Sequence, residues 1–319
     1  MRTTRRLLTI IVPPVIFLLV LVSAAWGQLS DAERAVVTIL HDYEISPNIT
    51  YIVANNFEAK LDVYRPRSAK SPVPVVMFIH GGGWVGGTKE DSALALLPYL
   101  HMGFAAVNVE YRLGKVSLAP AAAEDCLCAV HWVGVNAKKY NFDLNKVIVT
   151  GGSAGGHLAL TTAMIPASAG FESECAYQED ESWSGPWTDV RPRVAAVVNW
   201  FGITDVVDML QGAPNTRSYA VSWLGSLPNR EDLAKRLSPL TYVRAGLPPI
   251  LTIHGDADHI VPYSHAVRLH EALNKVGVKN QLFTIAGGGH GDFTLDQEMK
   301  AYEAIHAFLA GLGITAVSK

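Results

Sequence analysis

Apolar and polar positions along the chain follow two successive patterns. Residues 49–54 and 59–64 alternate apolar and polar side chains, which predicts antiparallel strands with one solvated face. From Val73 onward the apolar runs become nearly continuous, as in parallel strands that helices cover on both faces. These runs predict six further strands, at residues 73–79, 104–109, 147–150, 194–200, 250–253 and 281–285.

Helical stretches are predicted between and around these strands. They cover residues 29–42, 90–101, 119–139, 156–164, 263–276 and 295–311. Strands that alternate with helices favour a wound sheet, so we expect an α/β fold with an eight-stranded, mostly parallel sheet flanked by helices. Residues 165–191 and 202–245 are too long for simple connections, and we expect them to form cap-like walls over one sheet edge. Plain surface packing is the alternative for any single aromatic residue in them.

The first residues have the pattern of a secretory signal peptide. Three arginines, at positions 2, 5 and 6, precede the apolar run Leu7–Val22, and small residues follow it. Cleavage is expected after Gly27 or after Ala25. The alternative is an uncleaved membrane anchor, but the run contains Pro13 and Pro14 and is short for a span of about 20 residues. We therefore expect no stable membrane span after cleavage.

This pattern sets the expected domain organisation and location. Residues 1–27 are predicted to be the signal peptide, and residues 28–319 a single domain that includes the insertions at about 165–191 and 202–245. The mature protein is expected to be secreted or periplasmic.

Composition narrows the class of protein further. The chain has 319 residues, of which 49% are hydrophobic and 17% charged, with a formal net charge of −3. Such a chain can bury a large core. Its net charge is close to zero, so the composition does not indicate the positively charged surface that nucleic-acid binding requires.

The three cysteines leave two alternatives open. Cys126 and Cys128 point to different sides of a predicted helix, so either one could pair with Cys175, or all three could stay reduced. No histidine stands at zinc-ligand spacing from them, and we expect no metal.

The pentapeptide Gly151–Gly155 is the first stretch that indicates chemistry. It has the form G-x-S-x-G, follows the apolar run 146–150 and leads into a predicted helix. A strand, this motif and a helix make a nucleophile elbow, so Ser153 is the candidate nucleophile. The alternative is a glycine-rich turn that holds a phosphate or merely packs tightly.

A serine hydroxyl needs a base and an orienting acid to become a nucleophile at neutral pH. His290 follows the last predicted strand in a glycine-rich loop and is the candidate base. Asp258 follows the penultimate strand and is the preferred acid, whereas Asp256 fits a turn residue and Asp205 would be an unusual placement. The order Ser153, Asp258, His290 is that of the α/β-hydrolases.

Backbone amides after the third predicted strand could hold the oxyanion. The sequence there is His-Gly-Gly-Gly-Trp at 80–84, and we assign the oxyanion hole to the amides of Gly82, Gly83 and Ala154. Trp84 could lend its amide instead of Gly82, and it is also the candidate substrate-binding residue. A phosphate-binding loop is the rival interpretation, but the lysine and Ser/Thr of such a loop are missing.

Four motifs in this order resemble a known family. The stretches HGGGW (80–84), GGSAGG (151–156), HGDAD (254–258) and GGGHG (287–291) are similar to those of the hormone-sensitive-lipase-like esterases. Residues 110–113, 137–143 and 238–240 also resemble a bacterial branch similar to acetylxylan and feruloyl esterases. The likeness covers about residues 50–310. The chain departs from that branch in its acidic segment 165–191 with Cys175, and it has no recognisable carbohydrate-binding module.

The resemblance implies an exported serine carboxylic-ester hydrolase that works through an acyl-enzyme. Its substrate would be a small-molecule or polysaccharide-linked ester with a short-chain, acetyl or feruloyl-type acyl group, and no cofactor would be needed. One alternative is a serine peptidase of the same fold, although exported peptidases of this kind usually carry a propeller or a large cap domain. Another is a non-catalytic binding protein on a hydrolase scaffold, which would be expected to lose a triad position, and none is lost here.

Overall fold

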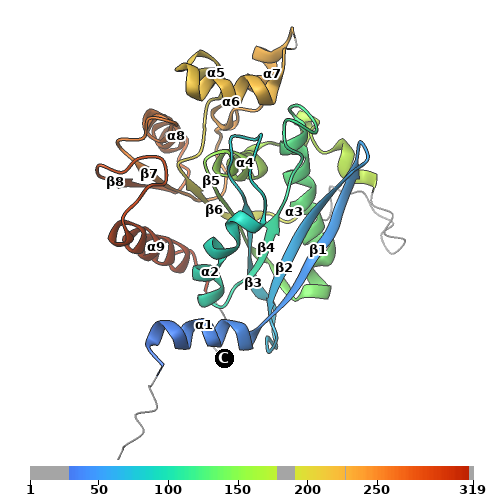
Figure 1. Ribbon diagram of the computed structural model, residues 1–319, viewed down its shortest axis with the longest axis vertical. Helices are drawn as coiled ribbons and strands as arrows, with labels where there is room; N and C mark the ends of the chain where they lie inside the picture. Colours follow the sequence, from blue (N-terminus) through green and yellow to red (C-terminus); the bar gives the residue numbers. More distant parts are fainter. Residues whose placement is uncertain (1–28, 178–190, 227, 316–319) are drawn as a thin grey trace, which may run out of the picture.

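The computed structural model describes residues 29–177, 191–226 and 228–315, and it contains a single eight-stranded sheet. The strands are β1 (Tyr43–Ala54), β2 (Phe57–Pro66), β3 (Val73–Ile79), β4 (Ala105–Val109), β5 (Phe142–Gly152), β6 (Val194–Trp200), β7 (Ile250–Gly255) and β8 (Asn280–Ile285). Their order across the sheet is β1-β2-β4-β3-β5-β6-β7-β8 (Figure 1). Strand β2 is antiparallel to both neighbours, and every pair from β4 to β8 is parallel. The predicted α/β fold class is confirmed.

Helices cover both faces of this sheet (Figure 1). The main helices are α1 (Asp31–Asp42), α2 (Leu97–His101), α3 (Ala121–Tyr140), α4 (Ala154–Met164), α8 (Ser264–Lys275) and α9 (Leu295–Ala310). Val75 and Met77 of β3 pack into the core beside α3 and α4, and Val76 and Phe78 pack into a second core beside α2 and α9. Because both faces of β3 are buried, its sequence is apolar at every position.

Residues 202–245 form short helices over the sheet edge at which the parallel strands end. These helices are α5 (Val206–Gln211), α6 (Pro214–Leu224) and α7 (Arg230–Arg236), and they stand at the top of Figure 1. The sequence predicted an insertion here but not its helices, which are only two or three turns long. A second difference is at β1, which begins at Tyr43 rather than at residue 49, because register shifts against β2 interrupt the alternation of side chains.

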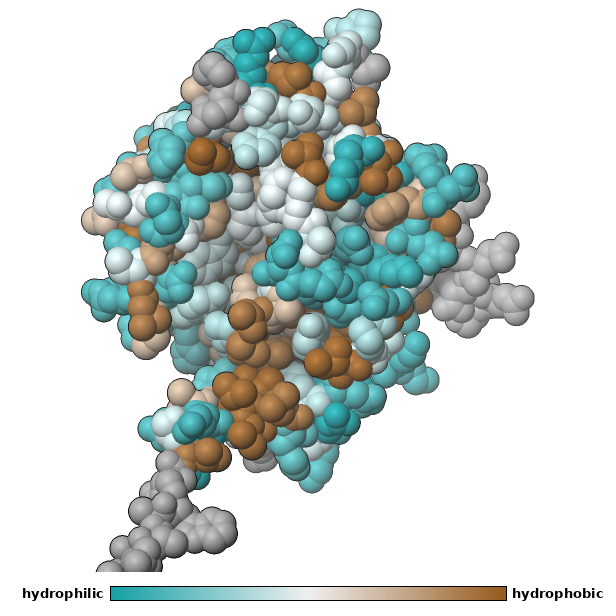
Figure 2. All heavy atoms as spheres, viewed as in Figure 1, coloured by the Kyte–Doolittle hydropathy of each residue, from teal (hydrophilic) through white to brown (hydrophobic). Residues whose placement is uncertain are grey.

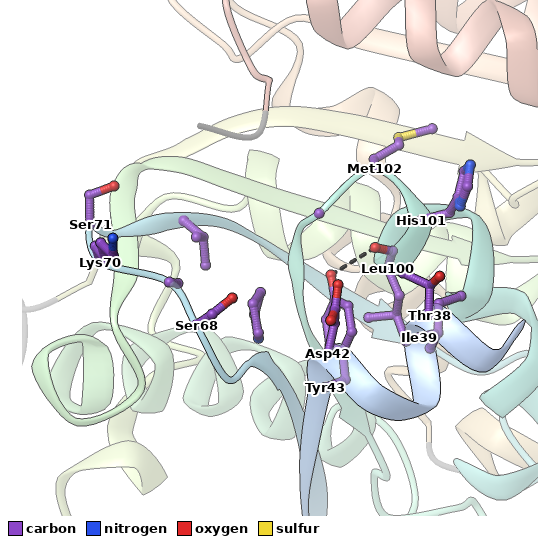
Figure 3. A pocket seen from close by; sticks show the side chains of 14 residues that line it. Thr38, Ile39, Asp42, Tyr43, Ser68, Lys70, Ser71, Leu100, His101 and Met102 are labelled. Atoms are coloured by element: carbon purple, nitrogen blue, oxygen red, sulfur yellow. Dashed lines mark hydrogen bonds between the residues drawn. The ribbon is translucent and has the colours of Figure 1, made fainter. Parts of the chain in front are cut away.

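A cavity of about 510 Å³ lies where β3 and β4 begin, at the end of the sheet opposite to the one that the helices α5 to α7 cover. Side chains of α1 and α2 border it, together with the segment between β2 and β3 (Figure 3). Apolar surface gathers over α1 and α2 in Figure 2. The exposed apolar side chains of α1 include Val36, Val37 and Leu40. Within the described ranges, no helix has the length and apolar character that a membrane span requires.

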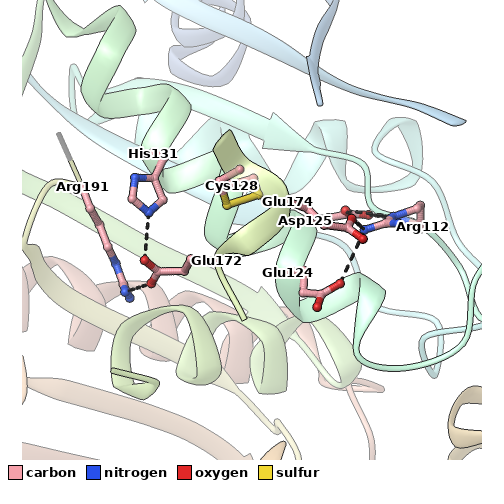
Figure 4. Close-up of a disulfide and its surroundings, with 9 residues drawn as sticks. Arg112, Glu124, Asp125, Cys128, His131, Glu172, Glu174 and Arg191 are labelled. Carbon is pink, nitrogen blue, oxygen red and sulfur yellow. Dashed lines mark hydrogen bonds and ion pairs between the residues drawn. A yellow bond between two sulfur atoms is a disulfide. The ribbon is translucent and has the colours of Figure 1, made fainter. Parts of the chain in front are cut away.

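A disulfide fixes the first half of the other insertion. Cys128 of α3 is bonded to Cys175 in the short 3₁₀ helix η3 (Ser173–Tyr177), with a Cα–Cα distance of 4.9 Å (Figure 4). Cys126 is free and buried. The structure thereby selects one of the pairings that the sequence left open, since Cys128 and not Cys126 faces η3.

Removing this disulfide is expected to destabilise the protein. Crosslinked residues 47 positions apart restrict the unfolded chain, so the double variant Cys128→Ala/Cys175→Ala should lose about 2–5 kcal/mol of unfolding free energy. Denaturant unfolding of the oxidised protein measures this loss. The control is Cys126→Ala, which removes a buried thiol without breaking a crosslink and should cost less. Equal losses in the two proteins would contradict the prediction.

Next to the disulfide, several carboxylates surround one buried arginine (Figure 4). Arg112 Nη2 donates to Asp125 Oδ1 at 2.7 Å and to Glu174 Oε2 at 2.6 Å. Glu124 lies further away, with its Oε2 3.8 Å from Arg112 Nη2. Burial raises the pKa of Glu124 to about 7, and the negative charge of Glu174 adds to this effect.

Because the pKa of Glu124 is raised, its ionised form is expected to lower the free energy of unfolding at alkaline pH. The folded protein holds this proton more tightly than the unfolded chain does, so stability falls as pH rises from about 4.5 to about 7 and then stays low. Because Glu124 is partly solvated, screening reduces this effect, and Glu124→Gln should raise the unfolding free energy by about 1–2 kcal/mol at pH 8 and by little at pH 4. Denaturant unfolding of both proteins across this range tests it, and a gain independent of pH would refute it.

Candidate active site

Ser153 lies at the sharp turn between β5 and α4. Its backbone has φ 56° and ψ −119°, an unusual conformation for a residue with a side chain. The turn also brings the first residues of α4 against the end of β3. A Cβ atom at Gly155 would lie 2.1 Å from the carbonyl oxygen of Ile79, so only glycine fits there. This geometry is that of a nucleophile elbow.

The structure brings His290 and Asp258 to Ser153. His290 Nδ1 lies 2.7 Å from Asp258 Oδ2, and His290 Nε2 lies 2.9 Å from Ser153 Oγ. A carboxylate only accepts hydrogen bonds, so Nδ1–H donates to Asp258 and leaves Nε2 free to accept from the Ser153 hydroxyl. The three side chains form one chain of hydrogen bonds at the carboxyl ends of the parallel strands.

Asp258 is buried and held as an anion. The backbone N–H groups of Ile260 and Val261 donate to Oδ1 at 2.8 and 2.9 Å. Burial alone would raise the pKa of Asp258, but hydrogen bonds from His254 and His290 outweigh it and lower that pKa well below its usual range. His254 Nε2 lies 3.3 Å from Asp258 Oδ2 and 2.9 Å from the carbonyl oxygen of Val261, so the two acceptors share its N–H. Sequence reasoning missed His254, although its place at the end of β7 inside the HGDAD motif was a signal.

The two alternative acids are engaged elsewhere. Asp256 is exposed, and its Oδ1 accepts from the backbone N–H of Gly287 at 2.7 Å. Asp205 caps α5 by accepting from Val207 N and pairs with Arg268. Of the three aspartates that the sequence offered, Asp258 is the one bonded to His290.

The candidate oxyanion donors belong to the glycine loop after β3 and to the start of α4. Gly82 and Gly83 have φ values of 109° and 60°, which side chains disfavour, and they border the same cavity as Ser153 and His290. Ala154 is the first residue of α4, so its N–H has no acceptor within the helix. These positions suit the assigned amides, whose role stays a prediction.

Trp84 is among the residues that border the cavity at Ser153. It is fully buried, and its ring stacks on Trp223, with ring centroids 4.4 Å apart. The role of Trp84 in binding substrate stays a prediction.

The cavity at Ser153 measures about 770 Å³. Apolar residues from the insertion 202–245 and from the segment after β7 line it, namely Ile203, Met209, Tyr219, Ile260 and Val261. Residues at the end of β3 and in the 3₁₀ helix η1 (Glu90–Leu96) also line it, and these include the polar His80, Asp91 and Ser92 as well as the apolar Phe78 and Ala95. The lining is therefore mixed in polarity.

Phe201 is a further residue of the site that the sequence did not indicate. It follows β6 with φ 37°, and its ring lies edge-on to the imidazole of His290, with centroids 4.8 Å apart. This contact limits the rotation of His290.

Within the described part of the chain, no group of three or more histidine, cysteine, aspartate or glutamate side chains could hold a metal ion.

This fold and this site define an α/β-hydrolase of the esterase class. The chain belongs to the BD-FAE family, whose model matches residues 61–273.

Known esterases are similar to this chain in sequence and fold. Esterase LipC of Mycobacterium tuberculosis is 29% identical over 246 residues, which are 74% of this chain and 57% of LipC. Thermogutta terrifontis esterase 2 with bound propionate has a TM-score of 0.68 and 26% identity, and the match covers 87% of this chain and 97% of that one. A truncated carbohydrate esterase from gut microbiota has a TM-score of 0.70 and 28% identity, covering 85% and 97%. The chain spans little more than half the length of curated relatives such as LipC.

Proposed function

We propose that this protein hydrolyses carboxylic esters through an acyl-enzyme on Ser153. The observation that carries the proposal is the hydrogen-bonded chain Ser153–His290–Asp258 at the wall of an open cavity. The similarity to esterases supports the same reaction type.

The first half of the reaction forms the acyl-enzyme. Ser153 Oγ attacks the ester carbonyl carbon while His290 Nε2 takes the hydroxyl proton, and the Asp258 anion stabilises the resulting imidazolium. The amides of Gly82, Gly83 and Ala154 donate to the oxyanion. When the tetrahedral intermediate collapses, the bond to the alcohol oxygen breaks and His290 returns the proton to the departing alcohol.

Water completes the turnover. His290 removes a proton from a water molecule, whose oxygen attacks the acyl carbon. The second intermediate breaks the bond to Ser153 Oγ, and His290 returns the proton to that oxygen. The products are the free acid and the restored serine.

The proposed substrates are esters with a short-chain, acetyl or feruloyl-type acyl group, either small molecules or linked to a polysaccharide. Apolar lining residues such as Met209 and Tyr219 suit an acyl group, and the polar lining residues His80 and Ser92 suit a hydroxyl-bearing alcohol. The structural relatives include an esterase that binds propionate and a carbohydrate esterase.

We also propose export with removal of residues 1–27, which lie outside the described residues. The Cys128–Cys175 disulfide supports this, since such bonds persist in oxidising compartments. Sequencing the N-terminus of the protein recovered from the periplasm or medium tests it. An intact Met1 there would count against cleavage.

A substrate panel tests the proposed activity. Purified protein is given p-nitrophenyl acetate, butyrate and octanoate, acetylated xylan and methyl ferulate, and kcat/KM is measured for each. We expect the acetate to be turned over faster than the octanoate. Absence of turnover on every ester, together with no labelling by a fluorophosphonate serine probe, would overturn the proposal.

A further inference from the structure

Trp84 holds a backbone conformation that an aromatic residue rarely adopts. Its φ is 63°, directly after the positive φ values of Gly82 and Gly83. A left-handed conformation at a non-glycine residue is unfavourable and persists only where surrounding contacts impose it. The contacts of Trp84 therefore determine the shape of the loop that presents the candidate oxyanion amides.

The indole of Trp84 is anchored in a buried cluster under that loop. Its Nε1–H donates to His157 Nδ1 at 3.0 Å. Its ring lies against Trp223 of α6 at an interplanar angle of 11°. The side chains of Trp84, His157 and Trp223 are all fully buried.

His157 links this anchor to the nucleophile. It is in the first turn of α4, and its backbone N–H donates to the carbonyl oxygen of Ser153 at 3.0 Å. Its Nε2–H donates to the carbonyl oxygen of Leu237, beyond α7, at 2.7 Å. Burial lowers the pKa of His157 to about 4, so the ring stays neutral and Nδ1 keeps the lone pair that accepts from Trp84.

We propose that the hydrogen bond between Trp84 and His157 positions the oxyanion amides of Gly82 and Gly83 relative to Ser153. The inference rests on the proposed esterase function. Oxyanion donors must lie within hydrogen-bonding distance of an oxygen that is charged only in the transition state. A contact that ties the glycine loop to α4, the helix that directly follows Ser153, fixes this distance. Trp84 and His157 thus act as positioning residues.

Two matched variants test the role of the hydrogen bond. Trp84→Phe and Trp223→Phe each replace one indole of the same stacked pair by a smaller ring. Only the first loses a bond to His157, because Trp223 Nε1 has no hydrogen-bond partner in the described structure. Steady-state kinetics with p-nitrophenyl acetate give kcat and KM. Inhibition by a trifluoromethyl ketone, which forms a tetrahedral adduct with serine, reports on the oxyanion site.

We expect Trp84→Phe to lower kcat by roughly 10- to 100-fold with KM little changed. Affinity for the trifluoromethyl ketone should fall by a similar factor. Trp223→Phe should change both quantities by less than about threefold, since it affects packing only. Thermal unfolding of both variants separates this effect from a general loss of stability.

His157 variants provide an independent test. In His157→Asn the side-chain oxygen can take the place of Nδ1 as acceptor, so this variant should keep most of the wild-type kcat. His157→Leu has no acceptor and should match Trp84→Phe. Equal losses in Trp84→Phe and Trp223→Phe, or a folded Trp84→Phe with unchanged kcat and ketone affinity, would overturn the positioning role. Wild-type protein that neither turns over esters nor reacts with a fluorophosphonate would instead refute the esterase function.

Discussion

Replacing Ser153 with alanine is expected to lower kcat for p-nitrophenyl acetate by about 10⁴- to 10⁶-fold. The variant loses the only atom to which the acyl group would be transferred, and His290 then has no hydroxyl to activate. The fold should be unaffected, because alanine fits wherever serine does and the hydroxyl of Ser153 points toward His290. Any remaining rate would come from substrate binding and the oxyanion amides acting on water.

The measurement compares initial rates of the wild-type protein with those of Ser153→Ala and Ser264→Ala. Ser264 is exposed at the start of α8, so its replacement controls for preparation and handling. A fluorophosphonate should label the wild-type and Ser264→Ala proteins but not Ser153→Ala. Equal rates in the wild-type and Ser153→Ala proteins would exclude the serine mechanism.

Asp258→Asn is expected to lower kcat by about 10³- to 10⁴-fold. An asparagine can offer its amide to His290 Nδ1, which favours the tautomer with the proton on Nε2, and that tautomer cannot accept the proton of Ser153. The negative charge that would stabilise the imidazolium is also lost.

Asp256→Asn is the matched control, because it makes the same chemical change two residues away. Its side-chain oxygen can still accept from Gly287 N, and the residue is exposed, so kcat should stay within about threefold of wild type. Steady-state kinetics of both variants decide between the two aspartates. A larger loss in Asp256→Asn than in Asp258→Asn would assign the acid to Asp256.

Much of this architecture could be predicted because the signals are local. The continuous apolar runs located β3, β4, β6 and β7 within one or two residues, since both faces of each strand are buried. Ser153, Asp258 and His290 each follow a parallel strand, and parallel strands end at the same sheet edge. Their proximity therefore followed from the order of the motifs, although their catalytic roles stay predictions.

Other features depend on contacts between distant residues, which no local pattern encodes. The burial of Trp84 depends on Trp223 and His157, which are far from it in sequence. Cys128 rather than Cys126 forms the disulfide with Cys175, because of the side of α3 that faces η3. The apolar residues of α5 and α6 are shared between the core and the cavity wall, so the sequences of these two helices do not indicate a single buried face.

The disulfide between α3 and η3 also makes the number of free thiols depend on the compartment in which the chain folded. Protein that acquires its structure in an oxidising environment carries a single free thiol, at Cys126, whereas protein that folds in a reducing cytoplasm carries the thiols of all three cysteines. The protein would be isolated from its native host, with an alkylating reagent added at lysis to trap free thiols. The number of alkylated cysteines per chain would then show whether the protein had folded in an oxidising or a reducing compartment.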